Sequence, residues 1–395
     1  MNKHEYTSYR WIILLVTFLP VFTLAMCQFQ VTPYAAEIMK NMGLSAQQYA
    51  TIATAPMLTG VFLAFVSGTL ADKFGVKNTV LVALIITTAA ALLRSLVGSY
   101  VLLLFITMLM GVAGTVINSN NVKIMSSWFP PHQMGVAMGI VIGAANGGTV
   151  LAMLLGKGLS PDYRKAFLYG GGVFVVLTIL WMLFMKEKTN EVHSDIDKPK
   201  SKIGDVLKSR NIWVASLGAA LFMGVNMCVS ALMAPGLVAK GVADGAANLA
   251  IMSFAIFAVI GSFIMPGVIA KQANTKTISA VLSIVGGITL YCGWVMSADV
   301  ARIILLAVCG FSLGGLLPTI MSVPAFLPEV GPVNMGSAGG VISTIMMAGA
   351  FLLPSYVVTP IAKGINNVTF IIAAVLAVLL AITFLFLPNV SVKKS

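Results

Sequence analysis

The sequence predicts an all-α polytopic membrane protein in which twelve transmembrane helices form two six-helix halves. Of its 395 residues, 58% are hydrophobic and only 9% are charged. Apolar runs recur along the whole chain, and one long polar segment separates six of them from six others. A soluble domain carries about a quarter charged residues, whereas an apolar run of about 20 residues crosses the hydrocarbon core of a bilayer.

The apolar runs, bounded by charged and turn-forming residues, place the twelve spans. The first six are expected at 10–34, 48–70, 79–97, 101–128, 134–157 and 166–186, and the second six at 212–235, 247–270, 278–297, 302–327, 336–362 and 366–388. The polar segment KEKTNEVHSDIDKPKSKIGDVLKSRN divides the chain into an N-terminal bundle at 1–187, a cytoplasmic linker at 188–210 and a C-terminal bundle at 211–395. A short surface helix is expected near 203–208.

The two halves read as repeats of one another. QMGVAMG at 133–139 returns as NMGSAGG at 334–340, at the start of the fifth span of each half. SGTLADKFGVK at 67–77 has a weaker echo in PGVIAKQANTK at 266–276. Transporters built from parallel repeats place the solute site near the bilayer midplane, where the repeats meet.

The positive charge of the chain follows the positive-inside rule rather than a nucleic-acid surface. The net charge is +12, and most of the 24 Lys and Arg fall in segments on one side of the predicted spans. This bias predicts an inner-membrane protein with both termini in the cytoplasm. We expect a monomer whose partners are the lipid bilayer and a small-molecule solute, with no nucleic acid.

Cysteine and acid positions give no support to an enzyme or a metalloprotein. The four cysteines lie in apolar runs without CxxC spacing, so neither a disulfide framework nor a metal site is predicted. The run from Trp11 to Cys27 follows Lys3 and Arg10 and has signal-peptide features, but an uncleaved first span is the favoured interpretation. No catalytic triad, phosphate loop or cofactor motif is present, and no cofactor is expected.

The fourth predicted span carries the most unusual polar cluster. The stretch AGTVINSNNVKIMSSWFPPHQMG contains Asn118, Asn121 and Lys123, and the two asparagines are three residues apart on one helix face. Lys123 is the one cation placed inside a span, where charge is costly and often functional. It either faces a cavity or reaches the nearby water line. Arg94, near the outer end of the third span, is expected to extend to the interface, with a binding role as the alternative.

GTLADKFGVKN at 68–78 resembles the loop signature of the major facilitator superfamily, G-x-L-A-D-[RK]-x-G-x-[RK], at the position between the second and third spans where that family carries it. The resemblance implies the major facilitator fold and transport by alternating access. It also implies gating roles for Asp72, Lys73, Gly75 and Lys77. The glycine ladder of the fifth span adds Gly139 and Gly143 as gating candidates, or as a static packing face.

The superfamily architecture implies which other polar residues reach the solute. Its first, fourth, seventh and tenth helices line the cavity, with contributions from the fifth and eleventh. Besides Asn118, Asn121 and Lys123, the uncharged candidates for solute contact are Gln28, Gln30, Tyr34, Asn146, Asn226, Ser343 and Thr344. The structural alternative for each is hydrogen bonding between helices, worth about 0.6–2 kcal/mol in membranes.

Two stretches narrow the resemblance to carriers of small anions. WFPPHQMGVAMGIVIGAANGG at 128–148 is similar to nitrate/nitrite porters, and QFQVTPYA at 28–35 is similar to oxalate–formate antiporters. The anion-binding cations of those groups are missing. Their second-span arginine falls on Ala64, their eighth-span arginine falls within 263–265, and the eleventh-span lysine falls near Ile342. Nitrate and oxalate themselves are therefore disfavoured.

These observations predict a secondary transporter of a small polar solute, with a small organic anion such as a monocarboxylate as the leading candidate. None of the 12 acidic residues lies in the middle of a predicted span, so uniport or exchange is favoured over a carboxylate proton relay. Thr107 occupies the place of the basic residue that the superfamily carries early in the fourth span. A carrier or exporter of a neutral, zwitterionic or cationic solute or drug is the alternative, and a non-transporting receptor or regulator is the second.

Overall fold

The computed structural model describes residues 8–187, 203–270, 274–327 and 330–388. The described residues form helices and turns, with no strand among them. The first half contains α1 (Arg10–Phe29), α2 (Ala35–Met42), α3 (Ala46–Phe74), α4 (Val76–Leu93), α5 (Tyr100–Trp128), α6 (Pro131–Leu155) and α7 (Tyr163–Phe184).

The second half repeats this order with three interrupted helices. It contains α8 (Ile203–Lys208), α9 (Arg210–Met227), η4 (Cys228–Met233), α10 (Ala234–Ala239), α11 (Asp244–Ala270), α12 (Thr275–Val295), α13 (Asp299–Gly314), α14 (Leu316–Ser322), η5 (Val323–Phe326), α15 (Gly331–Leu352), η6 (Leu353–Val358), α16 (Thr359–Ala362) and α17 (Asn367–Phe386). α9, η4 and α10 are continuous, as are α15, η6 and α16. By length and composition, 11 helices in the described part of the chain could cross a membrane, and α3 is a further long helix of 29 residues.

The twelve predicted spans correspond to helices of the structure, and the layout confirms the predicted two-repeat helical fold. The first span was expected to reach residue 34, which is wrong, since α1 ends at Phe29 and the separate helix α2 follows. Pro33 has no N–H to donate to the Phe29 carbonyl four residues earlier, so the helix stops there. α2 in turn ends at Gly43, which adopts the left-handed conformation that favours glycine.

Side-chain caps mark several helix starts. The Ser45 hydroxyl accepts a hydrogen bond from the Gln48 N–H, and the Gln48 side chain accepts one from the Ser45 N–H, which forms a capping box at α3. Asn366 and Thr369 form the equivalent box at α17. Asp162 caps α7. These bonds satisfy N–H groups that the helix interior cannot reach.

Close helix contacts repeat between the halves and confirm the pseudo-symmetry. A Cβ on Gly111 of α5 would lie 2.2 Å from the Pro56 carbonyl oxygen of α3, and one on Gly310 of α13 would lie 2.1 Å from the Phe254 carbonyl oxygen of α11. Gly148 of α6 approaches α1 in the same way that Gly349 of α15 approaches α9. Small residues at these crossings allow backbone contact between helices in a lipid environment.

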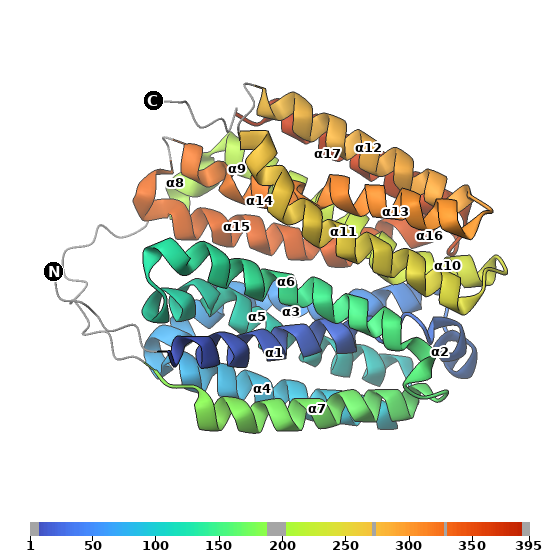
Figure 1. Cartoon of the computed structure of the whole chain (residues 1–395), viewed down its shortest axis with the longest axis horizontal. Coiled ribbons are helices and arrows are strands. Elements are labelled where there is room, and N and C mark those ends of the chain that lie inside the picture. The colour runs from blue at the N-terminus through green and yellow to red at the C-terminus, as the bar shows by residue number, and fades with distance from the viewer. Residues whose placement is uncertain (1–7, 188–202, 271–273, 328–329, 389–395) are drawn as a thin grey trace.

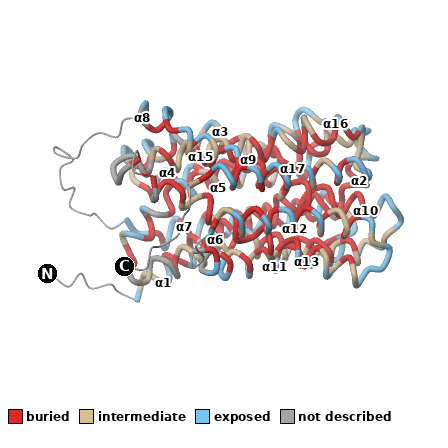
Figure 2. Tube along the Cα trace, turned by 90° about the horizontal axis from the view of Figure 1, so that it is seen from above, coloured by how far each residue is buried: buried red, intermediate tan, exposed pale blue. Residues whose placement is uncertain are grey.

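The helices run side by side along the long axis of the molecule (Figure 1). α2, α10 and α16 lie at one end, which we call the distal end; α8, at the other end, marks the proximal end. Buried residues run through the length of the helices, while exposed residues follow their outward sides (Figure 2). Many of the exposed side chains are large and apolar, including Leu96, Val101 and Val300, as expected of a surface that faces lipid.

Candidate functional site

The two bundles meet along two helix pairs, α3 with α15 and α6 with α11. A Cβ on Gly60 of α3 would lie 2.8 Å from Met347 Cγ of α15. A Cβ on Gly139 of α6 would lie 2.9 Å from Phe263 Cε1 of α11. The predicted gating residue Gly139 is therefore at a close contact between the halves, whereas Gly143, one turn further along α6, has no atom within 4 Å of the equivalent position.

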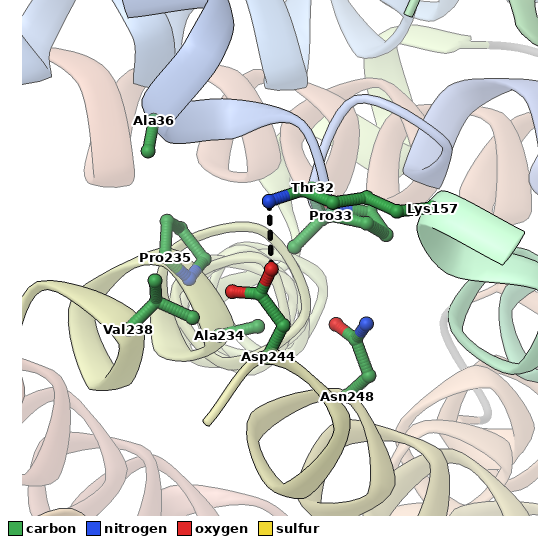
Figure 3. Close-up of a pocket in the computed structure, with 9 residues that line it drawn as sticks. All are labelled: Thr32, Pro33, Ala36, Lys157, Ala234, Pro235, Val238, Asp244 and Asn248. Carbon is green, nitrogen blue, oxygen red and sulfur yellow. Dashed lines mark hydrogen bonds and ion pairs between the residues drawn. The ribbon is translucent and has the colours of Figure 1, made fainter. Parts of the chain in front are cut away.

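An ion pair joins the bundles at the distal rim. Lys157, in the turn after α6, places Nζ 2.6 Å from Oδ2 of Asp244, the first residue of α11. The pair borders a small pocket that Thr32, Pro33 and Asn248 also line (Figure 3). Both charged side chains are partly exposed. The rim of the interface is thus held by an exposed electrostatic contact.

Two buried hydrogen bonds lie below this rim and join the same two bundles. The Tyr49 hydroxyl of α3 donates to the Ala231 carbonyl oxygen at 3.2 Å. The Thr54 and Ser355 hydroxyl oxygens lie 2.9 Å apart. Tyr49, Thr54 and Ser355 are each 0% exposed. With the ion pair, these contacts close the distal end between the halves.

Arg94 is buried inside the N-terminal bundle. The expectation that its side chain extends to the membrane–water interface is therefore wrong. It is 1% exposed; its guanidinium donates to the Cys27 carbonyl at 2.9 Å and to Gln30 Oε1 at 3.2 Å. The guanidinium carbon also lies 3.7 Å from the centroid of the Phe167 ring. A cation at the C-terminal end of α1 is favoured by the helix dipole and by the free carbonyls of the last turn.

Gln30 and Tyr34 are held by bonds within the N-terminal bundle. Gln30 Nε2 donates to the Ala166 carbonyl at 2.9 Å, while its Oε1 accepts from Arg94. The Tyr34 hydroxyl donates to the Ser160 carbonyl at 2.6 Å, and the Gly156 carbonyl oxygen lies 3.1 Å away as a second acceptor for the same proton. Burial raises the pKa of Tyr34, so its hydroxyl stays protonated and donates at physiological pH. These two candidates anchor the turns around the distal end of α1.

Gln28, the remaining candidate on α1, has a buried polar group without a partner. Its side chain is 6% exposed, and Nε2 has no hydrogen-bond partner within the described part of the chain. Thr107 Oγ1 of α5 is also buried and has no hydrogen-bond partner among the described residues. Buried donors without partners are uncommon in folded proteins and suit a ligand or water that supplies the acceptor.

The candidates on α5 divide between buried and exposed positions. Asn121 is 3% exposed and its Oδ1 lacks a partner among the described residues, whereas Asn118 and Lys123 are exposed. The Lys123 carbonyl accepts hydrogen bonds from Ser126 at 3.2 Å and Ser127 at 2.6 Å. The structure therefore does not bring the two asparagines into one buried patch.

The candidates on α6 and α15 share faces with residues that contact the opposite bundle. Asn146 is seven residues from Gly139, and Ser343 and Thr344 are four and three residues before Met347. Residues at these spacings lie on one side of a helix. All three side chains are half-buried, as is that of Asn226, two residues before η4. The half-buried polar candidates thus belong to helices that meet the bundle interface.

The loop signature is fastened to the end of the sixth span by Glu187. The Val76 N–H at the start of α4 donates to Glu187 Oε1 at 2.7 Å. Gly75 has φ +82°, and a Cβ there would lie 2.5 Å from Glu187 Oε2, so this position requires glycine. Lys73 is exposed with Nζ 5.3 Å from the Phe74 ring, and Trp181 donates to the Lys77 carbonyl. The side chain of Asp72 is outside the described residues.

The sequence profile of the major facilitator superfamily matches residues 13–354. The chain belongs to the major facilitator superfamily. It is a membrane transporter and not an enzyme. In the part of the chain that the structure describes, no group of three or more His, Cys, Asp or Glu could hold a metal ion.

Relatives and solved structures agree with this assignment. A probable nitrate/nitrite antiporter NarK1 of Thermus thermophilus is 27% identical over 386 residues, covering 89% of this chain and 84% of that protein. A hexuronate transporter of Bacillus subtilis is 25% identical over 159 residues, 39% of this chain and 37% of that protein. The fold matches a bacterial homologue of the human lysosomal transporter Spinster, in an inward-facing and occupied conformation, with TM-score 0.78, 15% identity and coverage of 96% and 97%.

Several residues of the interface were not among the sequence-based candidates. They are Tyr49, Thr54, Lys157, Asp244 and Ser355. Glu187, which binds Val76 within the N-terminal bundle, was not among the candidates either. One signal in the sequence could have indicated these interface residues. Pro235 and Pro360 follow η4 and η6, the two irregular turns that α3 contacts. The pairing itself joins positions about 180 and 300 residues apart, which periodicity along one chain does not reveal.

Proposed function

We propose that this transporter carries a small organic anion, such as a monocarboxylate, by alternating access, as a uniporter or an exchanger. The names of its relatives support this class, since nitrate, nitrite and hexuronate are anions and hexuronate is a carboxylate. Lys123 is the observation that carries the proposal, because it places an exposed cation on α5, two residues after buried Asn121. This chain lacks the two arginines that bind the anion in nitrate porters, so nitrate itself is disfavoured.

The solute path runs between α1, α5, α6, α9 and α15 in this proposal. Neutral hydrogen-bonding groups along this path come from Gln28, Asn121, Asn146, Asn226, Ser343 and Thr344. The entrance at the proximal end is lined by Asn118 and Lys123. Gln30 and Tyr34 shape the opposite end of α1 and set the position of Gln28. By the charge bias of the loops, the proximal end faces the cytoplasm.

Carboxylate positions support uniport or exchange. In the described part of the chain, Glu37, Asp162, Glu187, Asp244 and Asp299 lie at helix ends, in short surface helices or in turns. A proton relay through the protein would place a titratable group along the solute path. Exchange of one anion for another needs only the solute site and the two gates.

A ligand screen followed by flux measurement tests the proposal. Purified protein is heated with small carboxylates, inorganic anions, amino acids and quaternary amines in parallel. Stabilisation by a ligand grows as RT ln(1 + [L]/Kd), so millimolar concentrations detect weak binding. We expect carboxylates to raise the unfolding temperature and labelled carboxylate to exchange across proteoliposomes. Stabilisation by amines alone, or binding without flux, would contradict the proposal.

A further inference from the structure

Two π-helical turns interrupt the helices of the C-terminal bundle near its distal end. η4 continues α9 into α10, and η6 continues α15 into α16. π-helical residues make up well under 1% of residues in proteins and often mark functional positions. Both turns lie where the two bundles meet.

Prolines account for the two turns. Pro235 follows Ala231 by four residues, and Pro360 follows Tyr356 by four. In an α-helix the Ala231 and Tyr356 carbonyls would accept from the N–H of those residues, which proline lacks. The backbone widens to the i to i+5 pattern instead, and a carbonyl becomes available to a donor from outside the helix.

One helix of the other bundle contacts both turns. The Tyr49 hydroxyl of α3 donates to the Ala231 carbonyl, the group that Pro235 leaves without its usual donor. Five residues along α3, Thr54 hydrogen-bonds Ser355 inside η6. Because Tyr49, Thr54 and Ser355 are fully buried, water does not compete for these bonds while the distal end is closed.

We propose that Tyr49 and Thr54 are the positioning residues of the distal gate. Their hydroxyls hold the two π-helical turns against α3 in the closed state, and the gate opens when both bonds break and α3 separates from η4 and η6. The proposal rests on the carrier function proposed above and adds the residues that hold its distal gate. Each net hydrogen bond shifts the balance between closed and open states by about fivefold.

Distance measurements between spin labels test this gate without any solute. Labels are attached at Lys40→Cys on α2 and Ala239→Cys on α10, two exposed positions at the distal ends of the two bundles. The half-buried Cys292 is changed to Ser, and the other three cysteines are buried. Electron–electron double resonance then reports the ratio of long to short distances in Tyr49→Phe, Thr54→Val and the double variant.

We expect the ratio of open to closed distances to rise about fivefold in each single variant and about 25-fold in the double variant. Thr59→Val is the matched control, because Thr59 also lies on α3 but donates to Met108 within its own bundle. Should Tyr49→Phe fail to fold, Ser355→Ala removes the partner of Thr54 from the other side.

An unchanged distance distribution in the folded double variant would overturn the proposal. So would an equal shift in Thr59→Val, since that result would assign the effect to loosened packing of α3. The outcome is separable from the proposed function. Gate distances that shift as expected, in a protein that moves no carboxylate, would refute the choice of solute and leave the gate standing.

Discussion

Lys157 Nζ lies 2.6 Å from Asp244 Oδ2, and these two residues belong to different six-helix bundles. The pair sits at the rim of a closure whose deeper bonds are made by Tyr49 and Thr54. The side chains of Lys157 and Asp244 are 42% and 43% exposed, so solvent and salt screen their attraction. Most of the distal closure must therefore come from the buried contacts.

Removing one charge from this rim should have a small effect. We expect Asp244→Asn to change the free energy of unfolding by less than about 1 kcal/mol, as for other exposed ion pairs. The effect should vanish in high salt, and the exchanged pair Lys157→Asp with Asp244→Lys should recover it. Thermal unfolding at low and high salt measures this. A loss of several kcal/mol would show that the pair behaves as a buried one.

Arg94→Gln should lower stability strongly. The change leaves the Cys27 carbonyl and Gln30 Oε1 without their donor and removes the cation from the Phe167 ring. We expect a loss of about 2–5 kcal/mol, seen as a lower unfolding temperature and a lower yield of folded protein. Exposed Arg164→Gln is the control and should leave the unfolding temperature unchanged. Similar unfolding temperatures for both variants would contradict the burial argument.

Lys123→Gln should act on transport and leave folding intact. Because the Lys123 side chain is exposed, its loss should lower the unfolding temperature much less than Arg94→Gln does. A charge-assisted bond to an anionic solute contributes about 1.5–3 kcal/mol, so the KM for the anion should rise at least about tenfold. Lys363→Gln, an exposed lysine of the distal end, serves as the comparison. Equal and small effects would make Lys123 an anchor at the membrane surface.

Gly148→Ala should disrupt the N-terminal bundle. A Cβ there would lie 2.0 Å from the Phe22 carbonyl oxygen and 2.8 Å from the Met26 nitrogen, both backbone atoms that cannot move aside. We expect a loss of about 1–3 kcal/mol or more from overpacking. On the same helix, Gly143→Ala meets no atom within 4 Å and should be tolerated. Thermal unfolding in detergent is the measurement.

Exchange should proceed without a pH gradient. Liposomes loaded with unlabelled anion should take up labelled anion at equal internal and external pH, because the described carboxylates lie away from the proposed path. Collapsing the membrane potential tests in addition whether charge moves during exchange. Strict dependence on an inward proton gradient would contradict exchange. It would show that a titratable group couples transport to proton movement.

Much of the fold could be predicted because lipid imposes a simple rule on sequence. Every backbone polar group in the bilayer must be satisfied within its own helix, so apolar length alone locates the spans. The loop signature at 68–78 and the repeated MG stretches identified the family and the two halves. The irregular end of the first span was missed, although Pro33 gave a local reason for it.

The candidate site was harder to predict, as Arg94 and Gln30 illustrate. From sequence, Arg94 was a cation at the end of a span and Gln30 a polar group on the first helix. Their roles depend on α1, α4 and α7 meeting at one place, which brings Ala166, Cys27 and Phe167 around them. The sequence alone does not separate a polar side chain that binds solute from one that bonds to another helix, because the partner is known only from the packing.

The sequence by itself determined the helical membrane fold, the two repeats, the family and the class of function, because hydrophobic length and the loop motif are local properties. Only the tertiary structure decided that Arg94 is buried, that Glu187 holds the loop signature, and that Tyr49 and Thr54 reach two π-helical turns across the interface. The physical reason is that a hydrogen bond needs its partner within about 3 Å, and packing alone brings distant residues that close.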